Sequence, residues 1–299
     1  MCLKTAVTRV FSPRELAGWV AVALLAGSAV SVAAVAATDG RGDANPVTKI
    51  MIVVLENTDY SAALRQPFLS SLVARGALLD GFTAEAHPSQ PNYIALIAGS
   101  TYGVTSDDNV TIDGRQIGDL LESKGLQWKV YAEGYPGNCF LGSSAGAYVR
   151  KHLPFLSFKD VQADPVRCAR IVNASELATD VQNGTMPSFS LYVPDLNDDG
   201  HDTGIAFADR WLASTFSPLL DDPRFARGLQ FVVTFDESAD TAPGGNRVAT
   251  VLVGGALKPG TVIHANYNHY SLLRLVEDEL GLGSLGQGDA TAVLINGLQ

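Results

Sequence analysis

Two short apolar runs, each followed at once by a pair of polar residues, constrain the fold of this chain most strongly. Lys49–Leu55 (KIMIVVL) leads directly into Glu56–Asn57, and Leu229–Phe235 (LQFVVTF) leads into Asp236–Glu237. Short runs rich in β-branched residues are typical of strands that are buried on both faces of a parallel sheet. We therefore expect both runs to be central strands, with the polar pairs at their carboxyl ends.

The rest of the chain alternates between segments of strand and helix character. Further strands are predicted at Ala77–Ala86, Gln127–Ala132, Ser188–Val193 and Val248–Val253. Helices are predicted at Pro67–Arg75, Pro91–Ala98, Gln116–Lys124, Ser175–Gln182, Gly204–Phe216 and Tyr270–Leu280. This alternation predicts an α/β fold with a mostly parallel central sheet flanked by helices. Ligands of such folds bind beyond the carboxyl ends of the strands.

The first 37 residues have the pattern of a secretory signal. Three basic residues precede the apolar run Leu16–Ala37, which ends in small residues. A cleaved signal and a retained N-terminal membrane anchor both stay open, because the run is nearly long enough to span a bilayer. We expect residues 1–37 to be a signal peptide, 38–48 a linker and 49–299 a single catalytic domain. The expected location is secreted or periplasmic.

The charge balance excludes one class of partner. The chain has 31 acidic residues against 21 lysines and arginines, a formal net charge of −10, and no basic stripe. Nucleic-acid binding needs a clustered basic surface, so no nucleic-acid partner is expected. No other apolar run reaches spanning length, so we expect no stable membrane span once the signal is cleaved.

Cys139 and Cys168 are the two cysteines outside the signal segment. Two cysteines in an exported chain are expected to form a disulfide. The bond would close a loop of about 30 residues and stabilise the fold mainly by restricting the unfolded chain. Two free buried thiols are the alternative.

The polar pairs at the two strand ends predict a metal site. Glu56, Asn57, Asp236 and Glu237 would otherwise gather oxygen-bearing side chains with no cation between them. Oxygen ligands favour a hard ion, so we expect one divalent cation, Ca²⁺, Mg²⁺ or Mn²⁺. The alternative is that polar residues merely end two strands and begin two loops.

The segment from His87 to Tyr93 (HPSQPNY) precedes a predicted helix. A helix N-terminus favours negative charge, so Ser89 is the candidate nucleophile, attacking phosphorus with help from a bound metal. An ordinary N-cap serine is the alternative. In the same motif His87 is a candidate catalytic residue and Asn92 the candidate substrate-binding residue.

Two further histidines are catalytic candidates. Asp195–Gly200 begins like an EF-hand calcium-binding loop. Ala206 stands at the position where that motif needs Glu, so an EF-hand is excluded. In the same loop His201 is a candidate general acid, with Asp202 to orient it or to bind metal; a surface turn is the alternative. His269, just before the last helix, is a candidate phosphate contact or an exposed cap.

Other residues with possible chemistry receive less weight. His152 and His264 show no comparable context, so no role is assigned to them. Gly142–Gly146 (GSSAG) matches the G-x-S-x-G elbow of serine hydrolases and makes Ser144 a candidate nucleophile. That elbow needs a strand directly before it and a helix directly after it, and neither is predicted here.

Taken together and in this order, the motifs resemble the bacterial phosphoesterase family, which holds secreted acid phosphatases and phosphatidylcholine-type phospholipases C. The resemblance runs from about Lys49 to Leu280, and it is closest to the small secreted acid phosphatases of the SapM type. It implies a fold similar to the alkaline phosphatase superfamily. It also implies site roles: metal ligands at Glu56, Asn57, Asp236 and Glu237, the nucleophile at Ser89, a phosphate contact at His201, and motif positions at His87 and His269.

The expected function is therefore an exported, metal-dependent phosphomonoesterase, an acid phosphatase that works through a phosphoserine. A phospholipase C-type phosphodiesterase is the alternative on the same site. A serine esterase using Ser144 and a non-enzymatic calcium-binding module are alternatives of other classes. The expected partner is a small phosphorylated substrate or a phospholipid headgroup, and the oligomeric state stays open.

Overall fold

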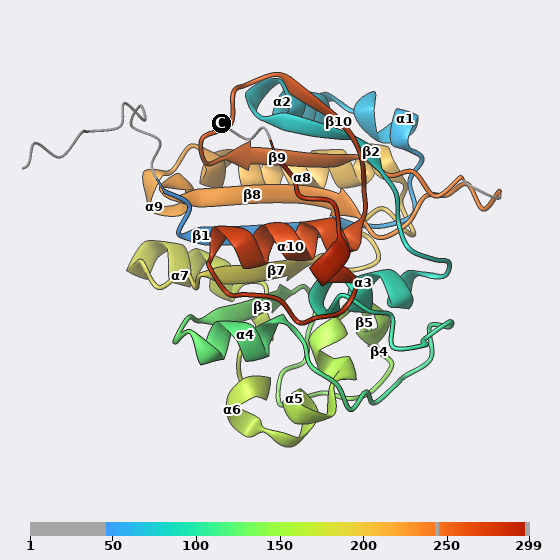
Figure 1. Cartoon of the computed structure of the whole chain (residues 1–299), viewed down its shortest axis with the longest axis vertical. Helices are drawn as coiled ribbons and strands as arrows, with labels where there is room; N and C mark the ends of the chain where they lie inside the picture. The colour runs from blue at the N-terminus through green and yellow to red at the C-terminus, as the bar shows by residue number, and fades with distance from the viewer. Residues whose placement is uncertain (1–45, 243–244, 297–299) are drawn as a thin grey trace, which may run out of the picture. The chain divides into compact units, whose positions relative to one another are not determined.

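One mixed sheet of eight strands forms the centre of the computed structural model, which describes residues 46–242 and 245–296 (Figure 1). The strand order is β10-β2-β9-β8-β1-β7-β3-β6. The strands are β1 (Lys49–Leu55), β2 (Ala77–Phe82), β3 (Trp128–Ala132), β6 (Ile171–Asn173), β7 (Phe189–Val193), β8 (Leu229–Phe235), β9 (Thr250–Gly254) and β10 (Thr261–Tyr267). Two short strands, β4 (Ser144–Ala145) and β5 (Tyr148–Val149), form a separate hairpin.

Most neighbouring strands in the sheet are parallel. Only β9 runs antiparallel to its neighbours, β2 and β8, while β10–β2, β8–β1, β1–β7, β7–β3 and β3–β6 are parallel. The predicted α/β class with a mostly parallel sheet is therefore confirmed. Every residue of β8 is buried, and so is every residue of β1 after Lys49. These strands are central because their continuous apolar runs need cover on both faces.

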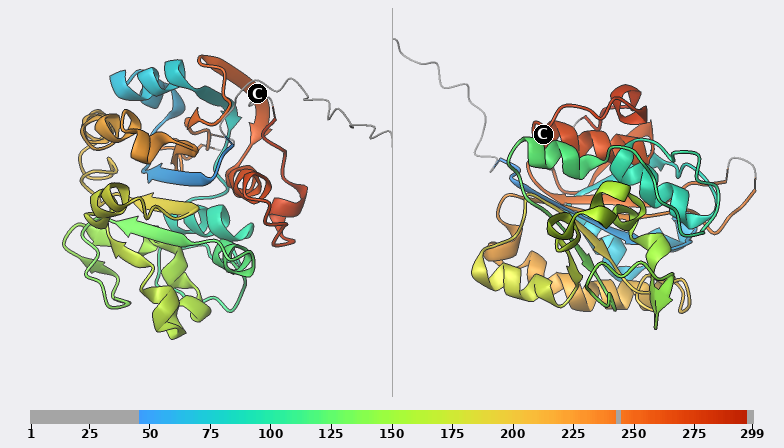
Figure 2. Two further views of the ribbon diagram at one scale, coloured as in Figure 1. Left: turned by 90° about the vertical axis from the view of Figure 1, so that its left-hand side faces the viewer. Right: turned by 90° about the horizontal axis from the view of Figure 1, so that it is seen from below.

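Helices cover both faces of the sheet, as the two views in Figure 2 show. On one face lie α3 (Ser89–Ala98), α4 (Ile117–Ser123) and α10 (His269–Glu279). On the other lie α2 (Pro67–Arg75), α7 (Glu176–Asn183), α8 (Ile205–Leu220) and α9 (Pro223–Ala226). The remaining helices are α1 (Tyr60–Leu64), α5 (Lys159–Ala163), α6 (Pro165–Cys168), η1 (Arg150–His152), η2 (Pro154–Ser157) and η3 (Gly288–Thr291).

The boundaries of several elements differ from those predicted. The strand predicted at Ala77–Ala86 ends at Phe82, because the following residues form the loop that leads to α3. The helix predicted to end at Phe216 continues to Leu220 and passes through Pro218. Four strands and four short α-helices were not predicted: β4, β5, β6, β10, α1, α5, α6 and α9. Successive residues of β10 alternate in exposure, and its polar residues hide the apolar signal of a buried strand.

An irregular segment between β3 and β6 packs beyond the edge of the sheet that these two strands form (Figure 1). The predicted disulfide is present here: Cys139 and Cys168 are bonded, with their Cα atoms 5.5 Å apart. The Arg150 guanidinium is buried in this segment and donates hydrogen bonds to the carbonyls of Val110, Leu141 and Leu156, each at 2.9 Å. The segment is thus held by one covalent and several polar contacts, although it has little regular structure.

The predicted signal peptide and most of the predicted linker lie outside the described residues. Within residues 46–242 and 245–296, no helix combines the length and the apolar character needed to cross a bilayer.

Candidate active site

The polar residues after β1 and β8 meet at one edge of the sheet. The two strands are parallel and in register, with Leu55 opposite Phe235, so Glu56 and Asp236 emerge side by side. The Asp236 N–H donates to the Leu55 carbonyl at 3.0 Å. The Glu56 N–H donates to the Asp199 carbonyl at 3.1 Å, which adds the loop after β7 to the same edge.

Glu56 is the centre of this cluster and is completely buried. Its Oε1 accepts a hydrogen bond from Ser89 Oγ at 2.8 Å and lies 2.5 Å from His152 Nε2. Lys151 Nζ lies 3.9 Å from the same oxygen. Burial by itself would raise the pKa of Glu56, but the charges and hydrogen bonds of these neighbours lower it to about 2. Glu56 is therefore an ionised carboxylate in a dry environment.

Asp236 and Glu237 bring two more carboxylates to the site. Asp236 is completely buried, and its Oδ1 accepts the backbone N–H groups of Glu237 at 2.7 Å and Asn57 at 3.3 Å. Burial, together with the charges of Glu56 and Glu237, raises the pKa of Asp236 well above its ordinary value. Glu237 Oε1 accepts from Ser89 Oγ at 3.4 Å, and its Oε2 lies 2.5 Å from His87 Nδ1.

These residues fit a hard cation by the chemistry of their donors. Glu56 Oε2 and Asp236 Oδ2 are buried and have no hydrogen-bond partner among the described residues. A buried carboxylate oxygen without a partner is costly, and a divalent cation would satisfy it. The Asn57 side chain is exposed, and the contact of this residue with Asp236 is through its backbone.

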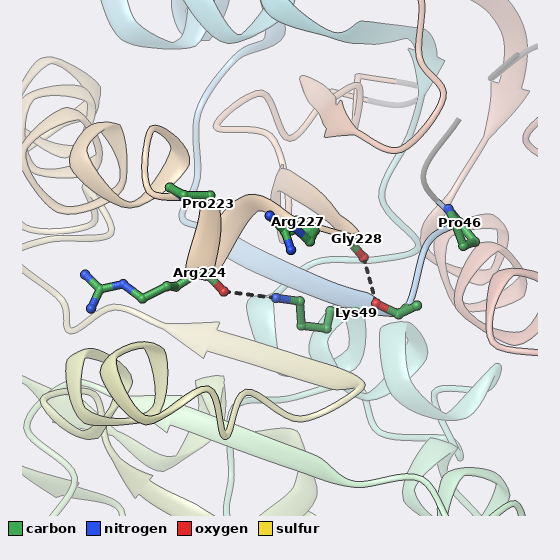
Figure 3. A pocket seen from close by; sticks show the side chains of 7 residues that line it. Pro46, Lys49, Pro223, Arg224, Arg227 and Gly228 are labelled. Atoms are coloured by element: carbon green, nitrogen blue, oxygen red, sulfur yellow. Dashed lines mark hydrogen bonds between the residues drawn. The ribbon is translucent and has the colours of Figure 1, made fainter. Parts of the chain in front are cut away.

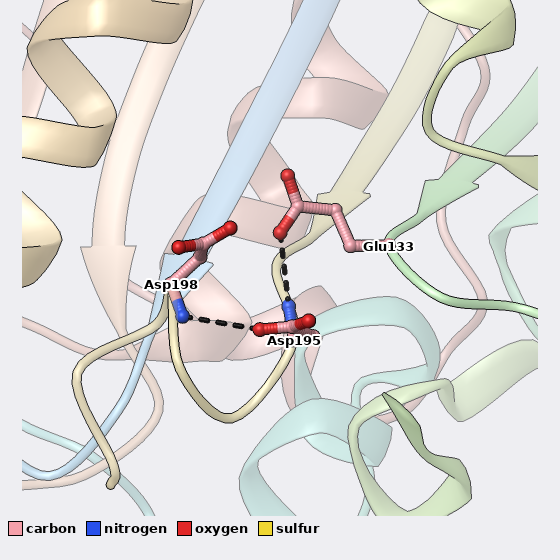
Figure 4. A group of neighbouring side chains, drawn as sticks. All are labelled: Glu133, Asp195 and Asp198. Carbon is pink, nitrogen blue, oxygen red and sulfur yellow. Dashed lines mark hydrogen bonds between the residues drawn. The ribbon is translucent and has the colours of Figure 1, made fainter. Parts of the chain in front are cut away.

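A second acidic group lies on the neighbouring loop (Figure 4). Among the described residues, Glu133, Asp195 and Asp198 form the only set of three or more His, Cys, Asp or Glu whose possible ligand atoms all lie within 4.8 Å of one another. Glu133 already accepts hydrogen bonds from the Tyr192 hydroxyl at 2.8 Å and the Asp195 N–H at 3.2 Å. This group differs from the predicted ligand set and shares no residue with it.

Ser89 is the first residue of α3, two residues before the predicted helix start, and it is buried. Pro88 occupies the N-cap position, and no side chain caps the helix. The Ser89 hydroxyl instead points to the carboxylates of Glu56 and Glu237. This geometry differs from that of an ordinary N-cap serine and places the oxygen where the partial positive charge of the helix end acts on it.

Asn92 holds the loop that leads into Ser89. Its buried side-chain carbonyl accepts the N–H groups of Glu85 and Ala86, each at 2.9 Å, and its amide donates to the Ala86 carbonyl at 2.8 Å. These contacts indicate that Asn92 positions the loop that carries His87. The predicted contact of Asn92 with substrate stays a prediction.

His201 and Asp202 lie on the loop after β7, and both are exposed. His201 Nδ1 is 2.7 Å from Asp202 Oδ1, so the two side chains are in contact. The His201 N–H donates to Asp199 Oδ1 at 2.7 Å, which links this loop to the buried end of the site.

His269 occupies a different environment from the one expected. The ring is buried, its Nε2 lies 3.1 Å from the Phe235 carbonyl, and it packs edge-on against Phe82. Burial lowers the pKa of His269 to about 4, so the ring is neutral at neutral pH. In this geometry His269 supports the end of β8, and the predicted phosphate contact stays a prediction.

Two residues of the cluster, Lys151 and His152, were not predicted from the sequence. His152 is completely buried between Glu56 and Asp199, and its ring stacks on Tyr93 with centroids 4.8 Å apart. Lys151 lies beside Ser89 and Glu56. The available signal was charge, because Arg150, Lys151 and His152 form a basic tripeptide in an acidic chain, far from any predicted strand end.

Ser144 lies away from these contacts, in the β4–β5 hairpin, and its side chain is exposed. The hairpin provides neither the strand before the serine nor the helix after it that a nucleophile elbow requires.

A cavity of about 540 Å³ lies near the amino ends of β1 and β8 (Figure 3), lined by Pro46, Thr48, Lys49, Pro223, Arg224, Arg227 and Gly228. It is therefore at the opposite end of these strands from Glu56 and Asp236.

The fold is similar to that of solved proteins of the alkaline phosphatase superfamily. A solved member from Vibrio parahaemolyticus has a TM-score of 0.58 and 13% identity, covering 83% of this chain and 72% of that one. Residues 59–283 match the Phosphoesterase family, and the chain belongs to this family.

Named relatives agree with this assignment. The phosphate-repressible acid phosphatase of Penicillium chrysogenum is 38% identical over 81% of this chain and 61% of that protein. The phosphatidylinositol-3-phosphatase of Mycobacterium tuberculosis is 32% identical over 95% of this chain and 93% of that protein. The chain spans only 57% to 65% of the length of the four fungal relatives.

The family and its acid phosphatase relatives support the predicted enzyme class, a phosphoric ester hydrolase. The expected restriction to bacterial members and to the SapM type is not confirmed, because fungal acid phosphatases are similar to this chain over about the same region.

Proposed function

We propose that this protein is an exported, metal-dependent phosphomonoesterase of the acid phosphatase type, with Ser89 as its nucleophile. The observation that carries the proposal is the buried Ser89 hydroxyl at the start of α3, which donates to Glu56 Oε1 at 2.8 Å. The acid phosphatase relatives support the activity, and the predicted N-terminal signal supports export.

Glu56, Asp236 and Glu237, with Asn57, would hold the cation. When bound, a hard divalent ion lowers the pKa of a serine hydroxyl and withdraws charge from phosphoryl oxygens. The orphaned Glu56 Oε2 and Asp236 Oδ2 support this ligand set. The identity of the ion, Ca²⁺, Mg²⁺ or Mn²⁺, is part of the proposal, since oxygen donors suit all three.

Ser89 Oγ, oriented by its hydrogen bond to Glu56 Oε1, would lose its proton to solvent and attack phosphorus in line with the leaving oxygen. The bond from phosphorus to the leaving oxygen breaks, and His201, oriented by Asp202, protonates the departing alkoxide. Water then attacks the phosphoserine and gives its proton to His201, which breaks the bond from phosphorus to Ser89 Oγ and releases inorganic phosphate. The serine oxygen regains its proton from solvent.

The substrate class follows from the same site. We propose a small phosphorylated molecule or a phosphorylated lipid headgroup. The Mycobacterium tuberculosis relative, which this chain matches over 93% of its length, is named a phosphatidylinositol-3-phosphatase. Its name favours including a lipid headgroup among the substrates.

The direct test is hydrolysis of p-nitrophenyl phosphate by the purified protein, with and without EDTA and with each cation added back. Ser89→Ala should reduce kcat by a factor of about 10⁴ or more, because the covalent route is lost. Ser144→Ala is the matched control and should keep wild-type turnover. A folded Ser89→Ala variant with normal kcat would overturn the proposal, and loss of ester cleavage in Ser144→Ala would favour the serine esterase.

A further inference from the structure

We propose that Lys151 sets the preference of this site for phosphomonoesters, by holding the doubly charged phosphoryl group of the substrate against Ser89. The inference rests on the proposed function, because it concerns the substrate of the same nucleophile. It assigns a role to a residue for which the sequence provides no motif.

The first argument is position. Lys151 Nζ lies 3.5 Å from Ser89 Oγ, and the side chain is only 19% exposed. When Ser89 Oγ attacks, the phosphorus atom comes within bonding distance of it. The other phosphoryl oxygens are bonded to that phosphorus and therefore lie close to Ser89 Oγ as well. They therefore come within reach of the Lys151 ammonium without any change in the fold.

The second argument is that the ammonium is held in place before substrate binds. Asp107 Oδ2 accepts from Lys151 Nζ at 3.1 Å, and Asp107 Oδ1 accepts the N–H of Gln90 at 3.0 Å. Gln90 follows Ser89 in α3, so one carboxylate ties the lysine to the helix that carries the nucleophile. A cation fixed in this way stabilises developing charge without a reorganisation cost.

The third argument is charge. Among the described residues, Lys151 is the one lysine or arginine that forms an ion pair with a carboxylate of the site, Glu56, at 3.9 Å. Coulomb attraction scales with the charge of the ligand. A phosphomonoester dianion therefore gains more from this ammonium than a diester, which carries one negative charge. Lys151 favours monoesters for this reason.

The test compares p-nitrophenyl phosphate with bis(p-nitrophenyl) phosphate in wild type, Lys151→Met and Lys151→Arg. Methionine keeps the length of the side chain and removes its charge. We expect kcat/KM for the monoester to fall about 10²-fold in Lys151→Met, with a loss at least tenfold smaller for the diester. Lys151→Arg should keep most of the monoester preference, because it keeps the charge.

Lys159→Met is the matched control, since Lys159 is exposed and pairs with Asp113 on the surface. A second readout is the binding of inorganic phosphate, measured by calorimetry. Its affinity should fall about tenfold in Lys151→Met and stay unchanged in Lys159→Met, as expected for the loss of one charged contact.

The outcomes separate the two proposals. If wild type hydrolyses neither ester, the proposed function fails. If wild type is active, but Lys151→Met loses both esters equally and binds phosphate normally, Lys151 has only a structural role and this inference is overturned. If Lys151→Met does not fold, Lys151→Gln takes its place, and an unchanged ester ratio and phosphate affinity in that variant would overturn the inference.

Discussion

His152 Nε2 lies 2.5 Å from Glu56 Oε1, and both side chains are completely buried. On its other side, His152 Nδ1 is 3.4 Å from Asp199 Oδ2. Burial alone would lower the pKa of His152, but the two carboxylates outweigh it and raise the pKa above its ordinary value. The ring thus lies between two carboxylates, one of which accepts the Ser89 hydrogen bond.

His152→Ala should therefore reduce both stability and activity. The substitution removes the imidazole that lies between the buried Glu56 and Asp199 carboxylates. Breaking a buried pair in this way costs about 3–5 kcal/mol. Urea unfolding measures the loss. His264→Ala is the control, because His264 contacts Asp80 on the surface and its removal should change the free energy of unfolding far less. Equal stability of the two variants would contradict the structural role of His152.

Cation binding should raise the melting temperature, Tm, of the protein, and EDTA should reverse the change. Without a cation, burial and the charges of Glu56 and Glu237 raise the pKa of Asp236, so the apoprotein loses stability as pH rises above the ordinary range of an aspartate. Asp236→Asn should remove part of this loss and reduce the rise in Tm produced by Mn²⁺, Mg²⁺ or Ca²⁺.

Asp195→Asn, in the second acidic group, is the control for that experiment. If the cation-induced rise in Tm disappears in Asp195→Asn and persists in Asp236→Asn, the loop group binds the ion and the proposed ligand set is wrong. Differential scanning fluorimetry with each cation is sufficient to decide between the two.

The Cys139–Cys168 bond should contribute about 3–4 kcal/mol, because it closes a loop with a sequence separation of 29 residues. The double variant Cys139→Ser, Cys168→Ser should lose that amount in guanidinium unfolding. It should also lose kcat/KM, because the closed loop carries Lys151 and His152. Reductant should lower wild type to the level of the double variant and leave the variant unchanged. A wild type that is insensitive to reductant would argue against a stabilising role.

Glu277 should make stability fall as pH rises. Burial, helped by the charge of Asp289, raises the pKa of Glu277 from 4.5 to about 8. Between these values the folded state keeps a proton that the unfolded state has lost, so stability is highest below pH 4.5 and declines until about pH 8. Glu277→Gln cannot ionise, so its Tm should exceed that of wild type increasingly across this window.

Asp278→Asn is the control for Glu277→Gln, since Asp278 lies on the same helix and is exposed. Its Tm should follow the wild-type pH profile. A Glu277→Gln profile parallel to wild type would show that Glu277 does not titrate abnormally in the folded protein.

The centre of the sheet could be predicted because its strands are continuous apolar runs. Lys49–Leu55 and Leu229–Phe235 match β1 and β8 residue for residue. The marginal strand β10 could not be predicted in this way, since its pairing partner, β2, is almost two hundred residues away in the chain and polar residues interrupt its apolar run. Tertiary contact rather than local preference determines such a strand.

The same distinction applies to the site. Glu56, Asp236 and Ser89 stand directly at strand ends or a helix start, where the fold class predicts ligand contacts. Lys151 and His152 stand in an irregular segment whose path depends on the Cys139–Cys168 bond and the buried guanidinium of Arg150. No local periodicity encodes that path, so their positions become visible only in three dimensions.

The edge of the sheet at β10 also affects the tendency of the protein to aggregate. In the described part of the chain β10 is one of the two edge strands of the sheet, with β6 at the other edge, and the register of β10 with β2 shifts between Ile263 and Asn266. The interrupted edge carries the exposed side chain of His264. A broken and polar edge is a poor template for pairing with a strand from another molecule. This edge thereby resists edge-to-edge aggregation at high concentration.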